Sequence, residues 1–438
     1  MPAALQRPNV VFLLTKIFLV PYTLLVRHCG QLLTVAGGLT DRPLTGAALH
    51  EWRILDDAYV ACEQDRIVAV GPMAELDTAH VTAATHVLDA GGRVVMPGLV
   101  ECHTHLVFGG NRADEFQRKL RGESYLDILA SGGGILSTVQ ATRAASDDEL
   151  LHHALHHLAG FRRYGVTTLE AKSGYGLDAT TELRLLRVAQ QAGRRQPVRV
   201  VPTFLGAHVP GPEYRGRPAD YLAMLAADVL PQLDPAEVLF VDIFCEEGAF
   251  DVAQAQHYLQ QAQQLGFKLK IHAEQLHNLG GCRMAAALGA TSVDHCDYLT
   301  AEDAAHVAAN GRTVAVLLPL VPLFLRQAQY APGRQFIDAG LPVAVSTDFN
   351  PGSCPSKNLW LALSVACLKM GLTPKEALAA VTLNAAWALD LQSEVGSLEP
   401  GKRADLLVLD VRSYEQIPYW LGENPVRSVI IGGELQQL

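Results

Sequence analysis

Two histidines placed two residues apart are the first feature of this sequence that could do chemistry. His103 and His105 flank Thr104 at the end of the apolar run PGLVECHTH. Side chains alternate along a strand, so both imidazoles point to the same side and can bind one metal ion through nitrogen. A single His-x-His pair is weak evidence, but His272 and Asp348 end two further β-branched runs. Together the four residues predict a site for one divalent metal ion.

The predicted ligands indicate a catalytic site. Three histidines and one aspartate leave a coordination position for water, and a metal brings the pKa of such a water close to neutrality. His295 ends another run, so we expect it to orient or deprotonate this water or to polarise the scissile carbonyl. A fifth ligand or a packing histidine is the alternative. Asp348 is expected to carry a proton as well as to bind the metal. The ligand types suit Zn²⁺, Fe²⁺ or Mn²⁺, and the affinity order alone does not choose among them.

These residues belong to a series of eight short β-branched runs, each followed by a polar or Gly-rich loop and a helical stretch. The runs are 93–105, 166–174, 198–208, 239–247, 268–275, 291–296, 312–319 and 342–348. Repeated βα units predict a parallel sheet, and eight of them predict an α/β fold of the TIM-type (β/α)8 barrel kind. Polar groups at the ends of the runs should converge on one mouth, because active sites of such barrels lie at the C-terminal ends of the strands. The groups are His105, Lys172, His208, Glu246, His272, His295 and Asp348.

The two ends of the chain have a different pattern. Residues 23–96 alternate short apolar runs with turn signals, and a related pattern returns in 396–438. We expect both segments to build one small β-sandwich domain beside a barrel of residues 97–395. Residues 1–22 are expected to be a disordered extension or to follow a mis-assigned start. Their apolar stretch Val10–Val20 is broken by Lys16 and is too short to span a bilayer, which argues against a signal peptide or anchor.

Composition narrows the class of protein further. The 438 residues are 49% hydrophobic and 18% charged, which is typical of a globular chain with a sizeable core. A net charge of −10 without a Lys/Arg run argues against nucleic acid as a partner. The eight cysteines form no Cys-x-x-Cys pair, which favours reduced thiols in a cytoplasmic protein over a disulfide scaffold.

Longer strings around these residues resemble the imidazolonepropionases, amidohydrolase-superfamily enzymes of histidine degradation. The resemblance runs over residues 23–438 through PGLVECHTHLVFGGNRADEF, SGGGI, EAKSGYGL, PTFLGAHVPGPEY, IHAEQL, VDHCDYL and STDFNPGSCPS. It implies hydrolysis of 4-imidazolone-5-propanoate at its ring amide to N-formimidoyl-L-glutamate, with zinc or iron bound, in a homodimer. Binuclear amidohydrolases often bridge their metals with a carbamylated lysine. Glu246 or Glu247 but no lysine ends the fourth run, so we expect one metal ion.

The resemblance also implies a set of substrate-binding residues. They are Arg112, Tyr125, Tyr175, His208, Gln275, Asn350, Gly352 and Ser353. Arg112 offers a planar fork for the substrate carboxylate, and the loop 350–353 can add amide and hydroxyl donors. Related deaminases carry a proton-shuttling Glu where this chain has Gln275. Gln cannot carry a proton, so we expect Gln275 to orient the substrate. Glu274 is adjacent, and alternation would turn it away from the site if the strand runs that far.

Two other functions fit parts of the pattern. Another cyclic amidase or a heterocyclic deaminase would keep the metal ligands but would not need Arg112. A metal-free binding protein could keep the barrel and lose the chemistry, although intact ligands argue against it. Two further features are expected to be structural: the histidines 152, 153, 156 and 157 as a solvated helix face, and Gly132–Gly134 as a loop over the barrel mouth.

Overall fold

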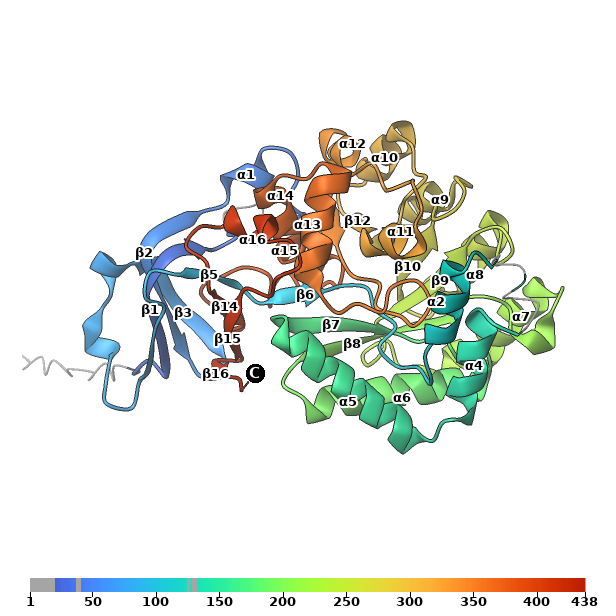
Figure 1. The fold of residues 1–438 in the computed structure, drawn as a ribbon, viewed down its shortest axis with the longest axis horizontal. Helices are drawn as coiled ribbons and strands as arrows, with labels where there is room; N and C mark the ends of the chain where they lie inside the picture. Colours follow the sequence, from blue (N-terminus) through green and yellow to red (C-terminus); the bar gives the residue numbers. More distant parts are fainter. Residues whose placement is uncertain (1–19, 37–40, 124–126, 128–131, 438) are drawn as a thin grey trace, which may run out of the picture.

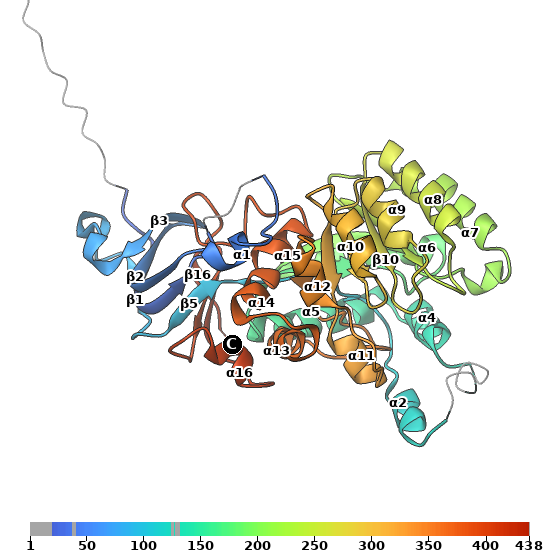
Figure 2. The same ribbon diagram turned by 90° about the horizontal axis from the view of Figure 1, so that it is seen from above.

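A computed structural model describes residues 20–36, 41–123, 127 and 132–437, which form a barrel with a smaller sheet beside it (Figure 1). Residues 1–19 of the predicted extension and Tyr125 lie outside the described residues. Figure 2, turned by 90°, shows the same two parts side by side, with the first and last strands of the chain together in the smaller sheet.

Eight parallel strands form the barrel, and they neighbour one another in sequence order from β6 to β13. They are β6 (Leu99–Glu101), β7 (Val166–Lys172), β8 (Arg199–Ala207), β9 (Phe240–Cys245), β10 (Lys268–Ala273), β11 (Ser292–His295), β12 (Val314–Leu317) and β13 (Val343–Val345). Each strand lies within one of the eight predicted runs. The first and last strands meet just beyond their ends, where His105 N–H donates to the Phe349 carbonyl at 2.9 Å. The predicted (β/α)8 barrel is therefore confirmed.

Helices follow the barrel strands and cover them. They are α2 (Ala113–Leu120), α4 (Ile135–Ala144), α5 (Asp147–Arg163), α6 (Ala179–Arg195), α7 (Pro218–Met224), α8 (Val252–Gln264), α9 (Gly281–Ala287), α10 (Ala301–Ala308), α11 (Leu320–Leu325), α12 (Gly333–Asp338), α13 (Leu359–Met370), α14 (Pro374–Ala380), α15 (Leu383–Trp387) and, near the C-terminus, α16 (Gln416–Tyr419). Ser146, Asp178 and Asp251 each accept a backbone N–H at the start of α5, α6 and α8, which fixes where these helices begin. None of the helices in the described ranges is long and apolar enough to cross a membrane.

The smaller sheet is mixed and takes strands from both termini. Its order is β16-β15-β14-β5-β1-β2-β3, with β4 also pairing β1. The strands are β1 (Leu24–Leu33), β2 (Ile54–Glu63), β3 (Arg66–Pro72), β4 (His86–Asp89), β5 (Val94–Pro97), β14 (Leu406–Leu409), β15 (Val426–Ile431) and β16 (Glu434–Leu435), with the short helix α1 (Ala48–Glu51) before β2. One edge of β1 pairs with β4 at its start and with β5 near its end. Residues of this sheet form an apolar core of their own, separate from the barrel core.

The first predicted run, 93–105, divides between the two sheets. Its first half is β5 of the smaller sheet, and its second half is β6 of the barrel. Gly98 lies at the crossing, where a Cβ atom would be 2.3 Å from Oγ1 of Thr167, so only glycine fits. The run therefore connects the smaller sheet directly to the strand that carries His103 and His105. The boundaries at 96/97 and 395/396 remain a prediction.

Candidate metal and substrate site

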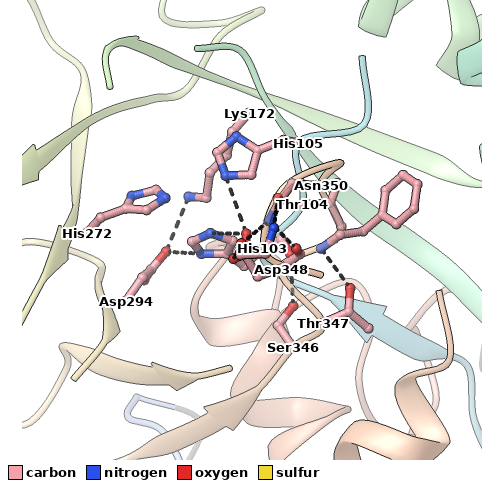
Figure 3. A network of polar contacts seen from close by, with 12 residues as sticks. His103, Thr104, His105, Lys172, His272, Asp294, Ser346, Thr347, Asp348 and Asn350 are labelled. Atoms are coloured by element: carbon pink, nitrogen blue, oxygen red, sulfur yellow. Dashed lines mark hydrogen bonds and ion pairs between the residues drawn. The ribbon is translucent and has the colours of Figure 1, made fainter. Parts of the chain in front are cut away.

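The predicted metal ligands lie together inside the mouth of the barrel. His103, His105 and His272 offer ligand atoms that all lie within 4.8 Å of one another, and His103, His295 and Asp348 form an overlapping group. All five side chains are buried. Figure 3 shows His103, His105, His272 and Asp348 converging from different strands. The structure thus brings together residues that are up to 245 positions apart in the sequence.

Strand alternation places the His-x-His pair as the sequence predicts. Thr104 points to the opposite side from its neighbours, because its Oγ1 donates to the Glu170 carbonyl at 2.5 Å. His103 and His105 are therefore both free to point into the site.

Two residues of the site have an unusual backbone conformation. Asp348 has φ 56° and His295 has φ 79°, both in the left-handed region that residues other than glycine rarely adopt. Each such residue costs on the order of 1–3 kcal/mol, and such residues gather at functional sites. The left-handed conformation changes the direction of the backbone at each of these residues, while the side chain still points toward the barrel mouth.

Three buried atoms indicate that the site fits a cation. Nε2 of His103, Nε2 of His272 and Oδ1 of Asp348 have no hydrogen-bond partner among the described residues. Nε2 of His103 and Nε2 of His105 each lie 3.4 Å from Oδ1 of Asp348. A buried polar atom without a partner costs about 1–3 kcal/mol, so three of them at one point call for a ligand. Three imidazoles and one carboxylate suit a divalent transition metal.

The orientation of two ligands is set by aspartates that the sequence analysis did not identify. Nδ1 of His103 donates to Oδ2 of Asp294 at 2.7 Å, and Nδ1 of His272 donates to Oδ1 of Asp242 at 3.1 Å. A proton on Nδ1 leaves the lone pair of Nε2 for a metal. In the sequence, Asp242 and Asp294 could have been noticed as single carboxylates within short strand-like runs, FVDIF and SVDH.

The electrostatics of the site favour a neutral His295. Burial holds the pKa of His295 well below its usual range despite the charge of Asp348, and the neighbouring His272 and His103 add to the effect. Its Nδ1 lacks a hydrogen-bond partner within the described ranges, so the ring is available to accept a proton. Burial raises the pKa of Asp348, but the nearby rings of His103 and His105 outweigh burial and keep the pKa well below its usual range.

A cavity of about 240 Å³ lies over these residues. Every described residue of the predicted substrate set lines it, and so do four of the site residues above. The substrate set comprises Arg112, Tyr175, His208, Gln275, Asn350, Gly352 and Ser353, and the others are His105, His272, His295 and Asp348. The structure therefore brings the described residues of the predicted substrate set and three of the four predicted metal ligands to one cavity.

Arg112 forms part of the wall of this cavity. Its Nε is buried and has no hydrogen-bond partner in the described part of the chain, so the guanidinium has donors to spare. Arg112 also lines a second cavity of about 600 Å³, which lies on its other side against α2 and α5. A cation with spare donors at the wall of a small cavity can bind an anionic group of a ligand.

The loop after Asp348 is organised by its own asparagine. Oδ1 of Asn350 accepts the backbone N–H groups of Gly352 and Ser353 at 2.7 and 2.8 Å, and its Nδ2 donates to the Asp348 carbonyl and to Oγ of Ser353. These amides were expected to be donors for the substrate, but in this structure they are used within the loop. The contribution of Asn350 is therefore first to fix the backbone around Asp348.

A buried glutamate holds the loop that carries Tyr175. Both carboxylate oxygens of Glu182 are occupied: they accept the backbone N–H groups of Gly174, Gly176 and Leu177 at 2.7–2.9 Å. Tyr175 is buried between these glycines and lies 5.5 Å from the ring of His105. Glu182 is another site-positioning residue that the sequence analysis missed.

Glu246, at the end of the fourth barrel strand, and Glu274, beside Gln275, both point away from the metal site. Glu246 accepts the backbone N–H groups of Leu276 and His277, and Glu274 accepts those of Gly280, Gly281 and Cys282. Glu274 therefore points away from the cavity, but not through strand alternation: β10 ends at Ala273, and Glu274 lies in the left-handed region with φ 51°. Gln275, by contrast, lines the cavity.

The histidine cluster on α5 is only partly a solvated face. His152, His153 and His156 are exposed, whereas His157 is half-buried with its ring centroid 5.4 Å from that of Phe108 and 4.9 Å from that of Phe349. The prediction of a solvated face was wrong for His157, because the buried side of α5 turns this position toward the loop after β13. Gly134 N–H donates to Glu115 of α2, and the neighbouring Ile135 lines the site cavity, as expected of a segment near the mouth.

Known proteins are similar to the chain over nearly its full length. The model of the amidohydrolase family matches residues 94–435. An imidazolonepropionase of Bacillus velezensis is 45% identical over 411 residues, which cover 94% of this chain and 96% of the relative. One of Symbiobacterium thermophilum is 44% identical over 418 residues, with 95% and 97% covered.

Solved structures share the fold at low sequence identity. An adenosine deaminase from Xanthomonas campestris with bound zinc superposes with a TM-score of 0.68 at 19% identity, covering 95% of this chain and 93% of its own. A putative prolidase from Bifidobacterium longum gives a TM-score of 0.65 at 21% identity, with 95% of each chain covered. At this identity the likeness concerns the architecture alone.

Proposed function

The chain belongs to the imidazolonepropionase family of the amidohydrolases, and we propose that it hydrolyses the ring amide of 4-imidazolone-5-propanoate to N-formimidoyl-L-glutamate in histidine degradation. One observation supports the proposal above all. The same small cavity contains, on one side, metal-ligating atoms without hydrogen-bond partners and, on the other, the guanidinium of Arg112, whose Nε has no partner in the described part of the chain. A cyclic amide with a carboxylate side chain matches both ends of such a cavity.

Four residues hold one divalent metal ion in this proposal: His103, His105, His272 and Asp348. When bound, the ion supplies Lewis acidity, which makes water a nucleophile near neutral pH and polarises an amide carbonyl. The four residues keep it at the bottom of the cavity, and Asp294 and Asp242 keep the Nε2 lone pairs of His103 and His272 directed at it.

Proton transfer is assigned to His295 and Asp348. His295 is neutral and lies beside the ligands, so its ring can orient the attacking water by a hydrogen bond or donate its N–H to the oxygen of the tetrahedral intermediate. The carboxylate of Asp348 takes the proton of the water and passes it to the ring nitrogen that leaves. Gln275 cannot take a proton and instead orients the ring by hydrogen bonds.

Substrate recognition is assigned to the far wall of the cavity. Arg112 binds the propionate in a bidentate manner, and Tyr175 and His208 bound the space for the ring. Nδ1 of His208 donates to the Gly174 carbonyl at 3.0 Å, which leaves its other ring nitrogen to accept from the substrate. Gly352 and Ser353 complete the wall, and Tyr125 is assigned to the same set on the family resemblance alone.

Several finer assignments follow from the family rather than from the site. We propose zinc or iron as the metal, a homodimer as the assembly, and the cytoplasm as the location, with no nucleic-acid partner. The chain is further divided into the small β domain of 23–96 and 396–438 and the barrel domain of 97–395. Metal analysis and sedimentation of the purified protein test the first two.

The decisive experiment follows the absorbance of imidazolonepropionate with and without a chelator. We expect consumption of the substrate by the holoenzyme, loss of activity after chelation, and recovery on adding back Zn²⁺ or Fe²⁺. Turnover that is unchanged in a metal-depleted protein would refute the proposed metal site. A purified chain without stoichiometric metal and without turnover would point to a binding protein.

An Arg112→Ala variant separates this activity from that of another cyclic amidase or a deaminase. A lost charge-assisted hydrogen bond costs about 1.5–3 kcal/mol, which corresponds to a rise in KM of roughly 10- to 150-fold for the carboxylated substrate. A neutral imidazolone that lacks the carboxylate should be hydrolysed equally by both proteins. An equal loss of activity on both substrates would favour another cyclic amidase or a deaminase.

A further inference from the structure

Beneath the metal ligands the barrel interior is charged. Glu170 and Lys172 on β7, Asp242 on β9, Lys270 on β10 and Asp294 on β11 are all fully buried. A buried charge without a partner is destabilised by several kcal/mol, so each of these side chains depends on its neighbours. The proposed catalytic roles use none of these five residues directly.

Lys172 is at the centre of this cluster. Its Nζ lies 2.7 Å from Oδ2 of Asp242, 3.2 Å from Oδ2 of Asp294 and 3.0 Å from Oε2 of Glu170. The two aspartates are the acceptors for Nδ1 of His272 and His103. Figure 3 shows the chain of contacts from Lys172 through Asp294 to His103.

The ammonium of Lys172 holds both carboxylates in place. Oδ2 of Asp294 contacts Nζ of Lys172 and also accepts from Nδ1 of His103. Asp242 contacts Nζ through Oδ2 and accepts from Nδ1 of His272 through Oδ1. The hydrogen-bond partner of a metal-binding histidine fixes the orientation of its ring. Without the ammonium, both carboxylates lose the contact that fixes them, and the two imidazoles lose their fixed orientation.

We propose that Lys172 is a positioning residue for the metal centre. Its ammonium fixes the carboxylates of Asp242 and Asp294, and these hold the rings of His272 and His103 with Nε2 directed to the metal position. Lys172 touches neither the substrate nor the reacting atoms. The inference rests on the proposed metal site, and its test measures metal binding rather than turnover.

Lys270 provides a matched control. It is as deeply buried on a neighbouring part of the barrel, with Nζ 2.9 Å from Oε1 of Glu170 and 4.8 Å from the centroid of the Phe240 ring. Within the described part of the chain, no ion pair joins Lys270 to Asp242 or Asp294. Lys270→Met therefore removes one buried positive charge from the same cluster without removing the contact to the aspartates.

The experiment titrates metal-free protein with Zn²⁺ in competition with a chromophoric chelator. We expect Lys172→Met to bind roughly 10- to 100-fold more weakly than the wild type, the range found when a partner of a metal-bound histidine is removed. Lys270→Met should stay within about threefold of the wild type. The visible spectrum of the Co²⁺-loaded protein should change in intensity for Lys172→Met only, because it reports the geometry of the ligands.

A second comparison tests whether Lys172 acts through the aspartates. In a background of Asp242→Asn and Asp294→Asn the carboxylates are gone, so adding Lys172→Met should change the affinity by less than about threefold. This background also lacks the buried negative charges that Lys172→Met would leave unpaired. Should Lys172→Met not fold in the wild-type background, Lys172→Gln takes its place, since the amide still donates but carries no charge.

Three outcomes would overturn the inference: wild-type affinity in a folded Lys172 variant, an equal loss in Lys270→Met, or an equal loss when the aspartates are already replaced. Failure of the proposed function can be told apart from these outcomes, because in that case the wild-type protein itself would bind no metal in the titration.

Discussion

The guanidinium of Arg112 lies directly against the Cα of Gly352, and a Cβ atom at position 352 would be 1.8 Å from Nη2 of Arg112. The loop after β13 therefore approaches the start of α2 so closely that a side chain at position 352 would have to displace the guanidinium. This contact links the segment that carries Asp348 to the residue assigned to the substrate carboxylate. The position of Arg112 thus depends on the absence of a side chain 240 residues away.

Gly352→Ala is expected to displace Arg112 and raise KM for the carboxylated substrate by about 10-fold or more, with a smaller change in kcat, because a shifted guanidinium loses part of a charge-assisted bond. Gly71→Ala is the control, since its neighbours lie at an ordinary 3.5 Å or more. Steady-state kinetics check the expectation. An unchanged KM would show that Arg112 does not bind the carboxylate in this position.

His295→Gln is expected to lower kcat by about 10²- to 10⁴-fold, the usual contribution of a positioned acid or base. The variant should still hold one metal ion per chain, because His295 is not among the proposed ligands. Metal analysis and kcat are measured on the same preparation. Near-normal kcat with full metal content would rule out His295 as the proton carrier, whereas loss of the metal would make it a ligand.

Glu182→Gln is expected to loosen the loop that carries Tyr175. An amide at this position offers an N–H₂ group to at least one backbone N–H that now has a carboxylate acceptor, at a cost of about 1–3 kcal/mol. Denaturant unfolding should show this loss together with a higher KM. Glu149→Gln, at the exposed start of α5, should change neither quantity appreciably. Equal stability of the two variants would contradict the role of Glu182.

The half-buried His157 predicts a pH dependence of stability. Burial, with a smaller effect of Lys357, lowers its pKa from 6.5 to about 3. The folded state therefore binds fewer protons at this site than the unfolded state, so the contribution is complete above pH 6.5 and is lost as the pH falls toward 3. Between pH 7.5 and 5.0 the loss from this one group is at most about 2 kcal/mol.

His157→Gln should therefore lose less stability than the wild type over this pH interval, whatever the substitution costs at pH 7.5. His156→Gln removes an exposed neighbour on the same helix and should behave as the wild type does. Denaturant unfolding at the two pH values gives the comparison. Parallel losses in all three proteins would mean that His157 titrates normally.

Much of the fold and part of the site could be predicted from local patterns. The eight βα runs and the alternation that pairs His103 with His105 depend only on residues close in the sequence, and the structure confirms them. The partners of Nδ1 of His103 and His272 could not be predicted. These partners, Asp294 and Asp242, lie on β11 and β9. The shift of neighbouring strands along one another decides which side chains lie at the same height inside the barrel.

The sequence by itself determined the barrel, the identity of the proposed ligands and the residues that gather at its mouth, because these follow from strand period and from residue chemistry. Only the tertiary structure decided how these groups are held. It placed Lys172 between Asp242 and Asp294, turned the side chain of Asn350 back onto its own loop, and packed His157 between two phenylalanines. Each of these contacts depends on distances between strands and loops far apart in the chain, and no local pattern encodes them.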